Sequence, residues 1–145
     1  MDLAKKVVDK MISGDAFSKW LGIDVLEVSE DLCKVKMQVR KEMTNGFDIA
    51  HGGITYSLAD SCLAFAANSY GIQALTLETS INYSKVAESG DVLTAISKKI
   101  FTNGKHYKSG KLAKYDIVIT NQNSEEIAHF TGIVYRNGEE WFPKN

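Results

Sequence analysis

The chain has almost no net charge, no long apolar run and only two cysteines, and each of these scarcities narrows what it can do. Its 145 residues carry a formal net charge of -1, with a pI near 6.3. Nucleic acids and anionic membranes call for a concentrated basic surface, so we expect neither as the main partner. No stretch reads as a bilayer span, and residues 1–20 lack the apolar core and cleavage site of a signal peptide. We therefore expect a cytoplasmic protein.

The two cysteines, Cys33 and Cys62, have neither metal-ligand spacing nor a partner nearby in the sequence. We expect reduced, packed thiols, with a disulfide or a reactive nucleophile as the weaker alternative. A metal site built from Asp48, His51 and Asp60 is disfavoured, because these positions do not converge on one helical face. We expect no metal and no cofactor beyond what a substrate carries.

The length of 145 residues and the hydrophobic content of 44% predict a single domain over residues 1–145. Hydrophobic periodicity then predicts its helices and strands. The expected helices cover residues 2–12, one further turn at 15–20, and residues 54–70 before Gly71. The expected strands are two about a turn at 29–31, then 75–84, 92–101, 111–121 and 127–137. Residues 102–110 are read either as a loop or as an extension of two strands.

The expected helix over 54–70 is apolar on most of its faces, which is typical of a buried helix. In the strand before it, Cys33, Val35, Met37 and Val39 alternate with polar residues, which indicates a sheet with one face toward water. The connections between the last three strands are too short for helical crossovers, so these strands are expected to be antiparallel. The prediction is an α+β fold in which a curved antiparallel sheet wraps around a central helix.

A single acid interrupts this apolar region. Between Ile49 and Leu77, Asp60 is the only formally charged side chain. Burying an unpaired carboxylate is costly, so such a residue usually has either a partner or a function. A structural acid paired with a hydroxyl or an arginine is the ordinary alternative to a catalytic one.

Two adjacent glycines, Gly52 and Gly53, precede the same helix. The first N–H groups of a helix have no intrahelical acceptor, and the helix dipole places partial positive charge there. Without side chains at these positions, a ligand oxygen can approach the amides closely. The pair suits a carbonyl oxygen that becomes negative during attack, although paired glycines alone more often mark turns.

Asp60 lies eight residues beyond Gly52, which corresponds to about 12 Å along a helix axis. One helix therefore cannot bring both groups to one carbonyl. Two antiparallel copies can, each lending its Asp60 to the Gly52 end of the other. If both groups belong to one site, the protein is at least a dimer. A serine hydrolase using Ser57 or Ser61 is disfavoured, because no nucleophile elbow is present.

These residues resemble the hotdog-fold thioesterases, specifically the PaaI-like branch of phenylacetate degradation that acts on acyl-coenzyme A. The match includes Asn45, the letters "HGG" from His51, and Asp60 within "SLAD". It extends to "LETSINYSKVAESGDVLTA" and "GKLAKYDIVITNQNSEEIAHFTGIVYR", and so covers most of the chain beyond residue 15. Two departures are Val86, where the family usually has proline, and the longer segment at 102–110.

By this resemblance, Asp60 is the base or nucleophile, and Gly52, helped by Gly53, is the oxyanion donor. Asn45 and His51 hold the thioester or orient groups around it, and Thr76 steadies the attacking water. Each has a simpler interpretation: Asn45 as a turn residue, His51 as a backbone-bonding residue at the helix entry, and Thr76 as a strand former.

The resemblance also implies contacts to coenzyme A, and lysines there suit its phosphates. The implied residues are Tyr83, Ser84, Lys85 and Val86 in one stretch, and Lys108, Ser109, Gly110 and Lys111 in another. His106 is expected in a solvated loop and His129 on a strand face. A homo-oligomer is implied, at least a dimer and by expectation a tetramer.

The resulting prediction is an acyl-coenzyme A thioesterase for aryl-acetyl or medium-chain acyl groups, with Tyr56, Leu63 and Phe65 as candidate residues of the acyl pocket. Two alternatives stay open. One is a module that binds acyl-coenzyme A without catalysis, which would not need Asp60. The other is a hydratase or dehydratase acting on acyl thioesters, which needs a differently placed histidine and acid.

Overall fold

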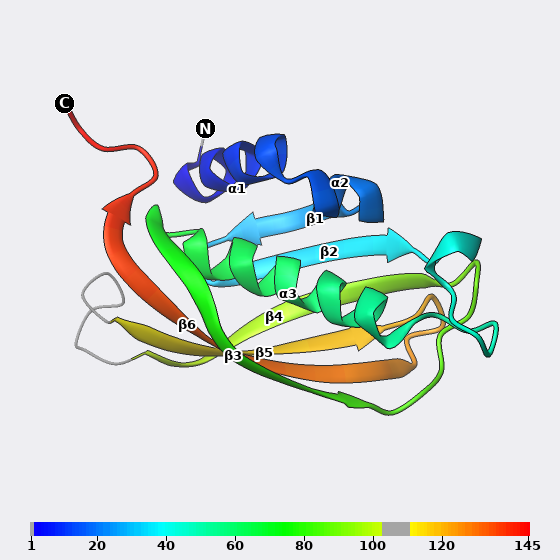
Figure 1. Ribbon diagram of the computed structural model, residues 1–145. Coiled ribbons are helices and arrows are strands. Elements are labelled where there is room, and N and C mark those ends of the chain that lie inside the picture. Colours follow the sequence, from blue (N-terminus) through cyan, green and yellow to red (C-terminus); the bar gives the residue numbers. More distant parts are fainter. Residues whose placement is uncertain (1, 103–110) are drawn as a thin grey trace.

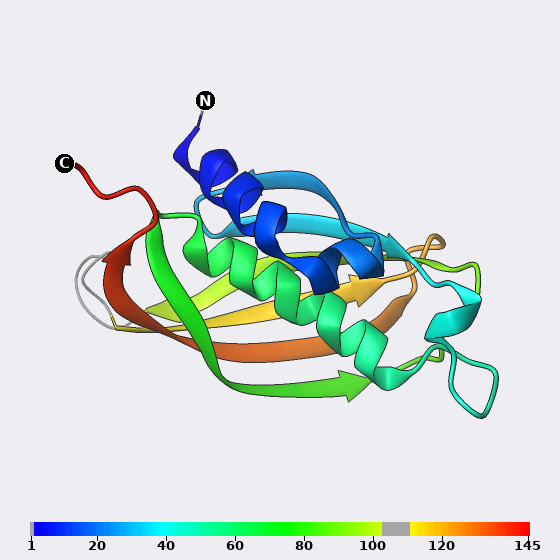
Figure 2. The same cartoon turned by 45° about the horizontal axis from the view of Figure 1, so that its top comes forward.

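In the computed structural model, which describes residues 2–102 and 111–145, a curved six-stranded sheet wraps around one central helix (Figures 1 and 2). The helices are α1 (Leu3–Gly14), α2 (Ala16–Leu21), the short 3₁₀ helix η1 (Lys41–Met43) and the central α3 (Gly52–Asn68). The strands are β1 (Asp24–Ser29), β2 (Leu32–Gln38), β3 (Ile72–Tyr83), β4 (Val92–Thr102), β5 (Leu112–Thr120) and β6 (Glu126–Glu140).

The strand order in the sheet is β1-β2-β4-β5-β6-β3, and every neighbouring pair is antiparallel. This confirms the predicted α+β architecture, including the antiparallel order of the last three strands. The order also leaves β1 and β3 at the two edges of the sheet. An edge strand presents unpaired backbone groups to whatever lies beside it.

Most predicted elements are present, with shifted ends. The central helix begins at Gly52 instead of residue 54, because the His51 side chain caps it, and it ends at Asn68. Strand β3 begins at Ile72 and β6 extends to Glu140, longer than the predicted segments at 75–84 and 127–137. The interpretations of residues 103–110, including His106, lie outside the described residues.

The core lies between α3 and the concave face of the sheet. The predicted alternation in β2 is confirmed, since Cys33, Val35 and Met37 are buried while the lysines between them face outward. On the helix, Leu63 and Phe65 are completely buried against the sheet. Each fully buried side chain of this size contributes about 1.5–3 kcal/mol to folding. The expectation that Leu63 and Phe65 line an acyl pocket is therefore wrong: both belong to the core.

Close packing of α3 on the sheet depends on Gly132 in β6. A Cβ atom added at this position would lie 2.4 Å from Cδ2 of Leu63. Because Leu63 is fully buried, it has little room to move away. The missing side chain at Gly132 thus sets how near the helix can approach the sheet.

Helices α1 and α2 lie on the β1 side of α3, away from β3 (Figure 2). The buried hydroxyl of Ser18 in α2 lies 2.8 Å from the hydroxyl of Ser61 in α3 and donates to Asp15 at 2.6 Å. This polar link fixes α2 on the central helix. Both cysteines are buried and free. Within the described ranges, no helix is long and apolar enough to cross a membrane.

Gly132→Ala is expected to lower the free energy of unfolding by about 1–3 kcal/mol, because overpacking a tight core forces side chains off their rotamers. Urea denaturation measures the change. The matched control is Gly14→Ala in α1, where an added Cβ meets nothing within 4 Å; no loss is expected there. Combining Gly132→Ala with Leu63→Ala should cost less than the sum of the two, and strict additivity would contradict the packing argument.

Candidate active site

The N-terminus of α3 leaves one backbone donor uncovered. His51 caps the helix: its Nδ1 accepts from the N–H of Gly53 at 2.9 Å, and its carbonyl accepts from the N–H of Ile54 at 2.9 Å. The N–H of Gly52 has no hydrogen-bond partner within the described part of the chain. At this end the helix dipole favours negative charge. Gly52 is therefore the donor available to an oxyanion, whereas the N–H of Gly53 is already occupied by His51.

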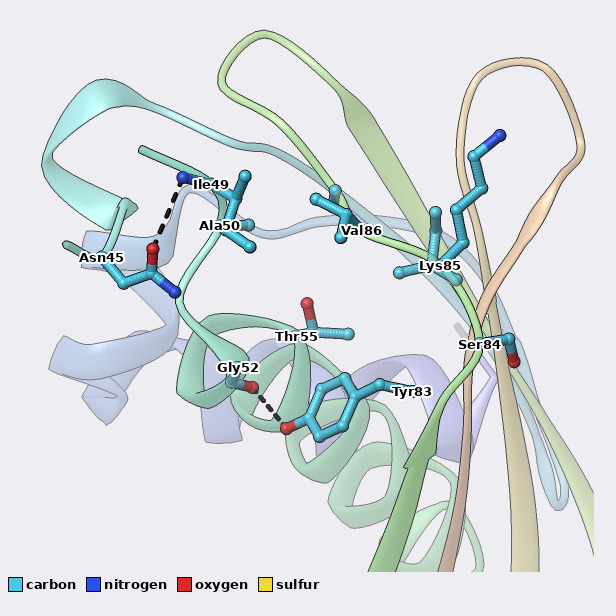
Figure 3. A pocket seen from close by; sticks show the side chains of 11 residues that line it. Asn45, Ile49, Ala50, Gly52, Thr55, Tyr83, Ser84, Lys85 and Val86 are labelled. Carbon is cyan, nitrogen blue, oxygen red and sulfur yellow. Dashed lines mark hydrogen bonds between the residues drawn. The ribbon is translucent and has the colours of Figure 1, made fainter. Parts of the chain in front are cut away.

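Tyr83, at the end of β3, packs beside the N-terminus of α3 (Figure 3). Its hydroxyl donates to the carbonyl of Gly52 at 2.7 Å. A Cβ on Gly52 would lie 3.0 Å from that hydroxyl oxygen. A side chain at position 52 would therefore require the Tyr83 phenol to shift by a few tenths of an ångström, and the hydrogen bond of Tyr83 orients the first peptide of the helix. Burial raises the pKa of the Tyr83 phenol, so the group stays a neutral donor at neutral pH.

A cavity of about 310 Å³ lies beside Gly52 (Figure 3). Its lining includes site residues that the sequence analysis predicted in two separate stretches of the chain. From the first stretch it takes Asn45 and Gly52, and from the second it takes Tyr83, Ser84, Lys85 and Val86. Ile49, Thr55 and Ile127 add apolar surface that was not predicted. A concave, mostly apolar site with a few placed polar groups is typical of ligand binding.

Asn45 lines this cavity while it also holds the loop before the helix. Its Oδ1 accepts from the N–H of Phe47 at 2.9 Å and from that of Ile49 at 3.5 Å. Its own N–H donates to the carbonyl of Ile49 at 2.8 Å. The side-chain oxygen of Asn45 therefore has the expected role of a turn residue. Its side-chain nitrogen forms no hydrogen bond with any residue in 2–102 or 111–145, and so it can contact a ligand in the cavity.

Asp60 lies outside this cavity, in the same helix as Gly52 and eight residues further along. Its Oδ1 accepts from the hydroxyl of Thr76 in β3 at 3.1 Å. Burial raises the pKa of the Asp60 carboxyl, and the Thr76 hydrogen bond opposes part of that rise. The acid thus has a partner within its own chain, and Thr76 contacts the acid directly.

Three contacts join one face of α3 to β3 at four-residue intervals. Gly52 meets Tyr83, the Tyr56 hydroxyl bonds that of Thr79, and Asp60 meets Thr76. Positions four apart share one face of a helix, so this face runs along the free edge strand. The spacing 52, 56, 60 is visible in the sequence, but the strand partners are not. Thr79 and the hydroxyl role of Tyr56 were missed for that reason.

The other predicted residues are dispersed. His51 is not among the residues that line the cavity at Gly52; it lines a separate hollow with Gly53 and Ser57. Lys85 forms an ion pair with Glu125, and this pair lowers the pKa of the Glu125 carboxyl. Lys111 is exposed, and Lys108, Ser109 and Gly110 lie outside the described residues. Over the described ranges, no group of three or more His, Cys, Asp or Glu side chains could hold a metal ion.

Thr76→Val is expected to raise the pKa of Asp60, because it removes a hydrogen bond to the ionised form while leaving the burial unchanged. Carbon-13 NMR of the Asp60 carboxyl, followed across a pH titration, measures the shift. Thr79→Val is the matched control, since Thr79 bonds Tyr56 instead of the acid. A downward shift, or equal shifts in both variants, would contradict the assigned contact.

Comparison with known proteins shows the family and the fold of this chain. The model of the thioesterase superfamily matches residues 47–128. The acyl-coenzyme A thioesterase PaaI of Escherichia coli is 35% identical over 128 residues, which is 88% of this chain and 87% of that protein. Its solved structure superposes with a TM-score of 0.87, covering 94% of this chain and 95% of that one.

A structure from Streptococcus mutans, bound to acetyl CoA, is 27% identical with a TM-score of 0.74, covering 81% of this chain and 90% of that chain. The region matched by the superfamily model, residues 47–128, contains Gly52 at the N-terminus of α3, Asp60 and Thr76. Family and fold thus coincide with the resemblance read from "HGG" and "SLAD". The chain belongs to the thioesterase superfamily and is a thioester hydrolase with the hotdog fold.

Proposed function

We propose that this enzyme hydrolyses acyl-coenzyme A, with an aryl-acetyl group (phenylacetyl or hydroxyphenylacetyl) or a medium-chain acyl group, to the free acid and coenzyme A. The observation that carries the proposal is the uncovered N–H of Gly52 at the mouth of a cavity. A partly buried acid with a raised pKa lies on the same helix, too distant to serve that mouth in its own chain. A second subunit supplies the missing acid.

The free edge of β3 supports pairing of two subunits. This strand is twelve residues long, and its apolar side chains Leu75 and Leu77 are 65% and 61% exposed. A long, apolar edge strand is a template for pairing with another chain. If two β3 strands pair antiparallel about a two-fold axis, the two α3 helices also run antiparallel, side by side along the joint.

Such an axis brings the catalytic groups together. When Gly52 of one subunit lies opposite Asp60 of the other, the midpoint falls at Tyr56, and symmetry produces two equivalent sites. Tyr56 is partly buried, with its ring edge-on to Phe130 at 5.3 Å, so it is held in place at this joint. Assembly of two dimers into a tetramer stays a prediction that solution mass measurements test.

In the proposed reaction, the thioester carbonyl oxygen accepts the hydrogen bond from Gly52. Asp60 of the partner subunit either removes a proton from a water that attacks the carbonyl carbon or attacks that carbon itself. Negative charge collects on the oxygen at the helix N-terminus, where the dipole stabilises it. Collapse of the intermediate breaks the carbon–sulfur bond and releases the coenzyme A thiolate. If Asp60 acts as the base, this step leaves the free acid, and the proton taken from water passes from Asp60 to the thiolate. If Asp60 is the nucleophile, this step leaves an acyl anhydride with Asp60, which a water molecule then cleaves to the free acid and the Asp60 carboxylate, giving its second proton to the thiolate.

The coenzyme A portion is assigned to the cavity formed by Tyr83, Ser84, Lys85 and Val86. The Streptococcus mutans relative bound to acetyl CoA supports a ligand of this kind. Lys85 is shared with Glu125 across a solvent-exposed pair, and such pairs contribute little stability, so a phosphate can recruit the lysine at small cost. Lys111 and the residues before it stay a proposed second contact to the phosphates.

Asp60→Asn is expected to reduce kcat on acyl-coenzyme A by at least about a hundred-fold, the usual contribution of a general base. Its stability should not fall. Because the folded pKa of Asp60 is raised, the folded state holds the proton more tightly than the unfolded state, and ionisation disfavours folding once pH exceeds the unfolded pKa. Thiol release and thermal unfolding at pH 7 measure both effects. Unchanged turnover would contradict the catalytic role proposed for Asp60.

Complementation tests whether the site is shared. Gly52→Pro removes the donor N–H at the first position of the helix, where the backbone accepts proline and the Tyr83 side chain must shift slightly to make room for the added ring. It should be inactive alone, as should Asp60→Asn. Co-expression with two different tags makes mixed dimers in which one site is intact. Random assortment then restores about a quarter of wild-type activity. If the site were contained in one chain, the mixture would stay inactive.

A further inference from the structure

Two hollows flank the N-terminus of α3, and only one of them is used by the proposed coenzyme A contacts. The second, which we term the Phe17 hollow, has a volume of about 320 Å³. It is lined by Phe17 of α2, Met43 of η1, and His51, Gly53, Ile54 and Ser57 at the start of α3. It shares no lining residue with the cavity at Gly52. Each hollow therefore borders one of the two adjacent glycines.

This division has a direct chemical meaning for a thioester held at Gly52. The carbonyl carbon bears two substituents, the sulfur of coenzyme A and the acyl group, and they leave it in different directions. If coenzyme A occupies the cavity with Tyr83 and Lys85, the acyl group must leave by another side. The Phe17 hollow borders Gly53, the next residue of the helix, and the His51 imidazole forms its near wall, with Nδ1 3.0 Å from where a Cβ of Gly53 would lie. We propose that this hollow is the acyl subsite and that Phe17 sets acyl specificity.

The ring of Phe17, which lines one side of the hollow, is positioned by contacts within the protein and needs no ligand to hold it. Its ring stacks on Trp20 with centroids 6.1 Å apart and an interplanar angle of 6°. The guanidinium of Arg40 lies 5.1 Å from the Trp20 ring centroid and donates to the carbonyl of Trp20 at 2.6 Å. A fixed aromatic surface loses little conformational entropy when a ligand packs on it. Phe17 is nevertheless 54% exposed, so it has apolar surface to offer.

The hydroxyl link between Ser18 and Ser61 fixes α2 to the helix that carries the reacting groups. Phe17 is the neighbour of Ser18, so its distance from the helix mouth is set by the same contact. This connection explains how a residue from the N-terminal segment can shape a site built on α3. It also differs from the acyl pocket expected from the sequence, of which Leu63 and Phe65 are buried in the core, while the partly buried Tyr56 bonds Thr79 on β3.

The polar groups of the hollow limit what fits. Nδ1 of His51 accepts from Gly53, so in the neutral ring the proton is on Nε2, which can donate to a ligand. The hydroxyl of Ser57 donates to the carbonyl of Gly53 at 2.7 Å. The carboxylate of Glu42, at the rim, is paired with Arg40. The subsite thus suits a compact, uncharged acyl group that can lie flat on Phe17.

The inference rests on the proposed thioesterase function, and the test separates the two. The ratio of kcat/KM for phenylacetyl-coenzyme A to that for acetyl-coenzyme A is measured for wild type, Phe17→Ala, Phe17→Leu and Phe142→Ala. Phe142 is the matched control, an aromatic residue 44% exposed that packs on Lys10 in a different hollow. Circular dichroism and thermal unfolding verify that each variant is folded.

We expect Phe17→Ala to lower this ratio about ten-fold, the scale of a lost apolar contact in a pocket. The loss should lie mainly in KM for the phenylacetyl substrate, Phe17→Leu should lie between, and Phe142→Ala should match wild type. An unchanged ratio in Phe17→Ala would overturn the inference and leave the hydrolase proposal intact.

If the wild-type protein releases no thiol from either substrate, ligand binding is measured instead of hydrolysis. The probe is a ketone analogue of phenylacetyl-coenzyme A, with a methylene group between sulfur and carbonyl, studied by calorimetry. Weaker binding to Phe17→Ala than to Phe142→Ala would then support the subsite while the hydrolase proposal fails. Equal binding to both variants would overturn the subsite.

Discussion

The N–H of Gly52, which has no partner among the described residues, is the feature on which the proposed function depends. Its neighbours are all satisfied: His51 takes the N–H of Gly53, and Tyr83 occupies the carbonyl of Gly52. These contacts leave one donor without a partner among the described residues at the positive end of a buried helix, at a residue that lines a cavity. Such a preorganised donor needs no rearrangement as charge develops on a bound oxygen. Tyr83 therefore acts first as part of the helix mouth and only second as a wall of the cavity.

The same helix that supplies the donor prevents its own acid from reaching it. Helix α3 packs tightly on the sheet through Leu63 and Gly132, so neither end can move toward the other. The contacts of Tyr56 and Asp60 instead follow β3, the strand with a free edge. Gly52 and Asp60 are held apart on one rigid helix, and the edge strand β3 beside them is unpaired within the described sheet. Together these features favour a site that a second copy of the chain completes. Helix α3 thus links the tight core packing to the proposed sharing of the site between subunits.

Asp60 illustrates the tension between stability and function. Its carboxyl is partly buried, which raises its pKa and disfavours the ionised form in the folded protein. One hydroxyl from Thr76 compensates in part. A carboxylate with few hydrogen bonds keeps more of its basicity than a fully satisfied one. The environment therefore suits proton transfer better than it suits folding.

The sequence by itself determined the α+β class, the buried helix, the alternating strands and the unusual position of Asp60, because these depend on local periodicity and on a scarcity of charge. The family followed from the letters around His51 and Asp60. Tertiary structure alone decided which amide stays free, which hydroxyls meet α3, and which apolar residues belong to the core. The contact between Tyr83 and Gly52 joins positions 31 residues apart. A helix that is apolar on most faces does not reveal which face meets the sheet. The sequence alone therefore could not show that Leu63 and Phe65 are buried in the core, where Leu63 packs against Gly132.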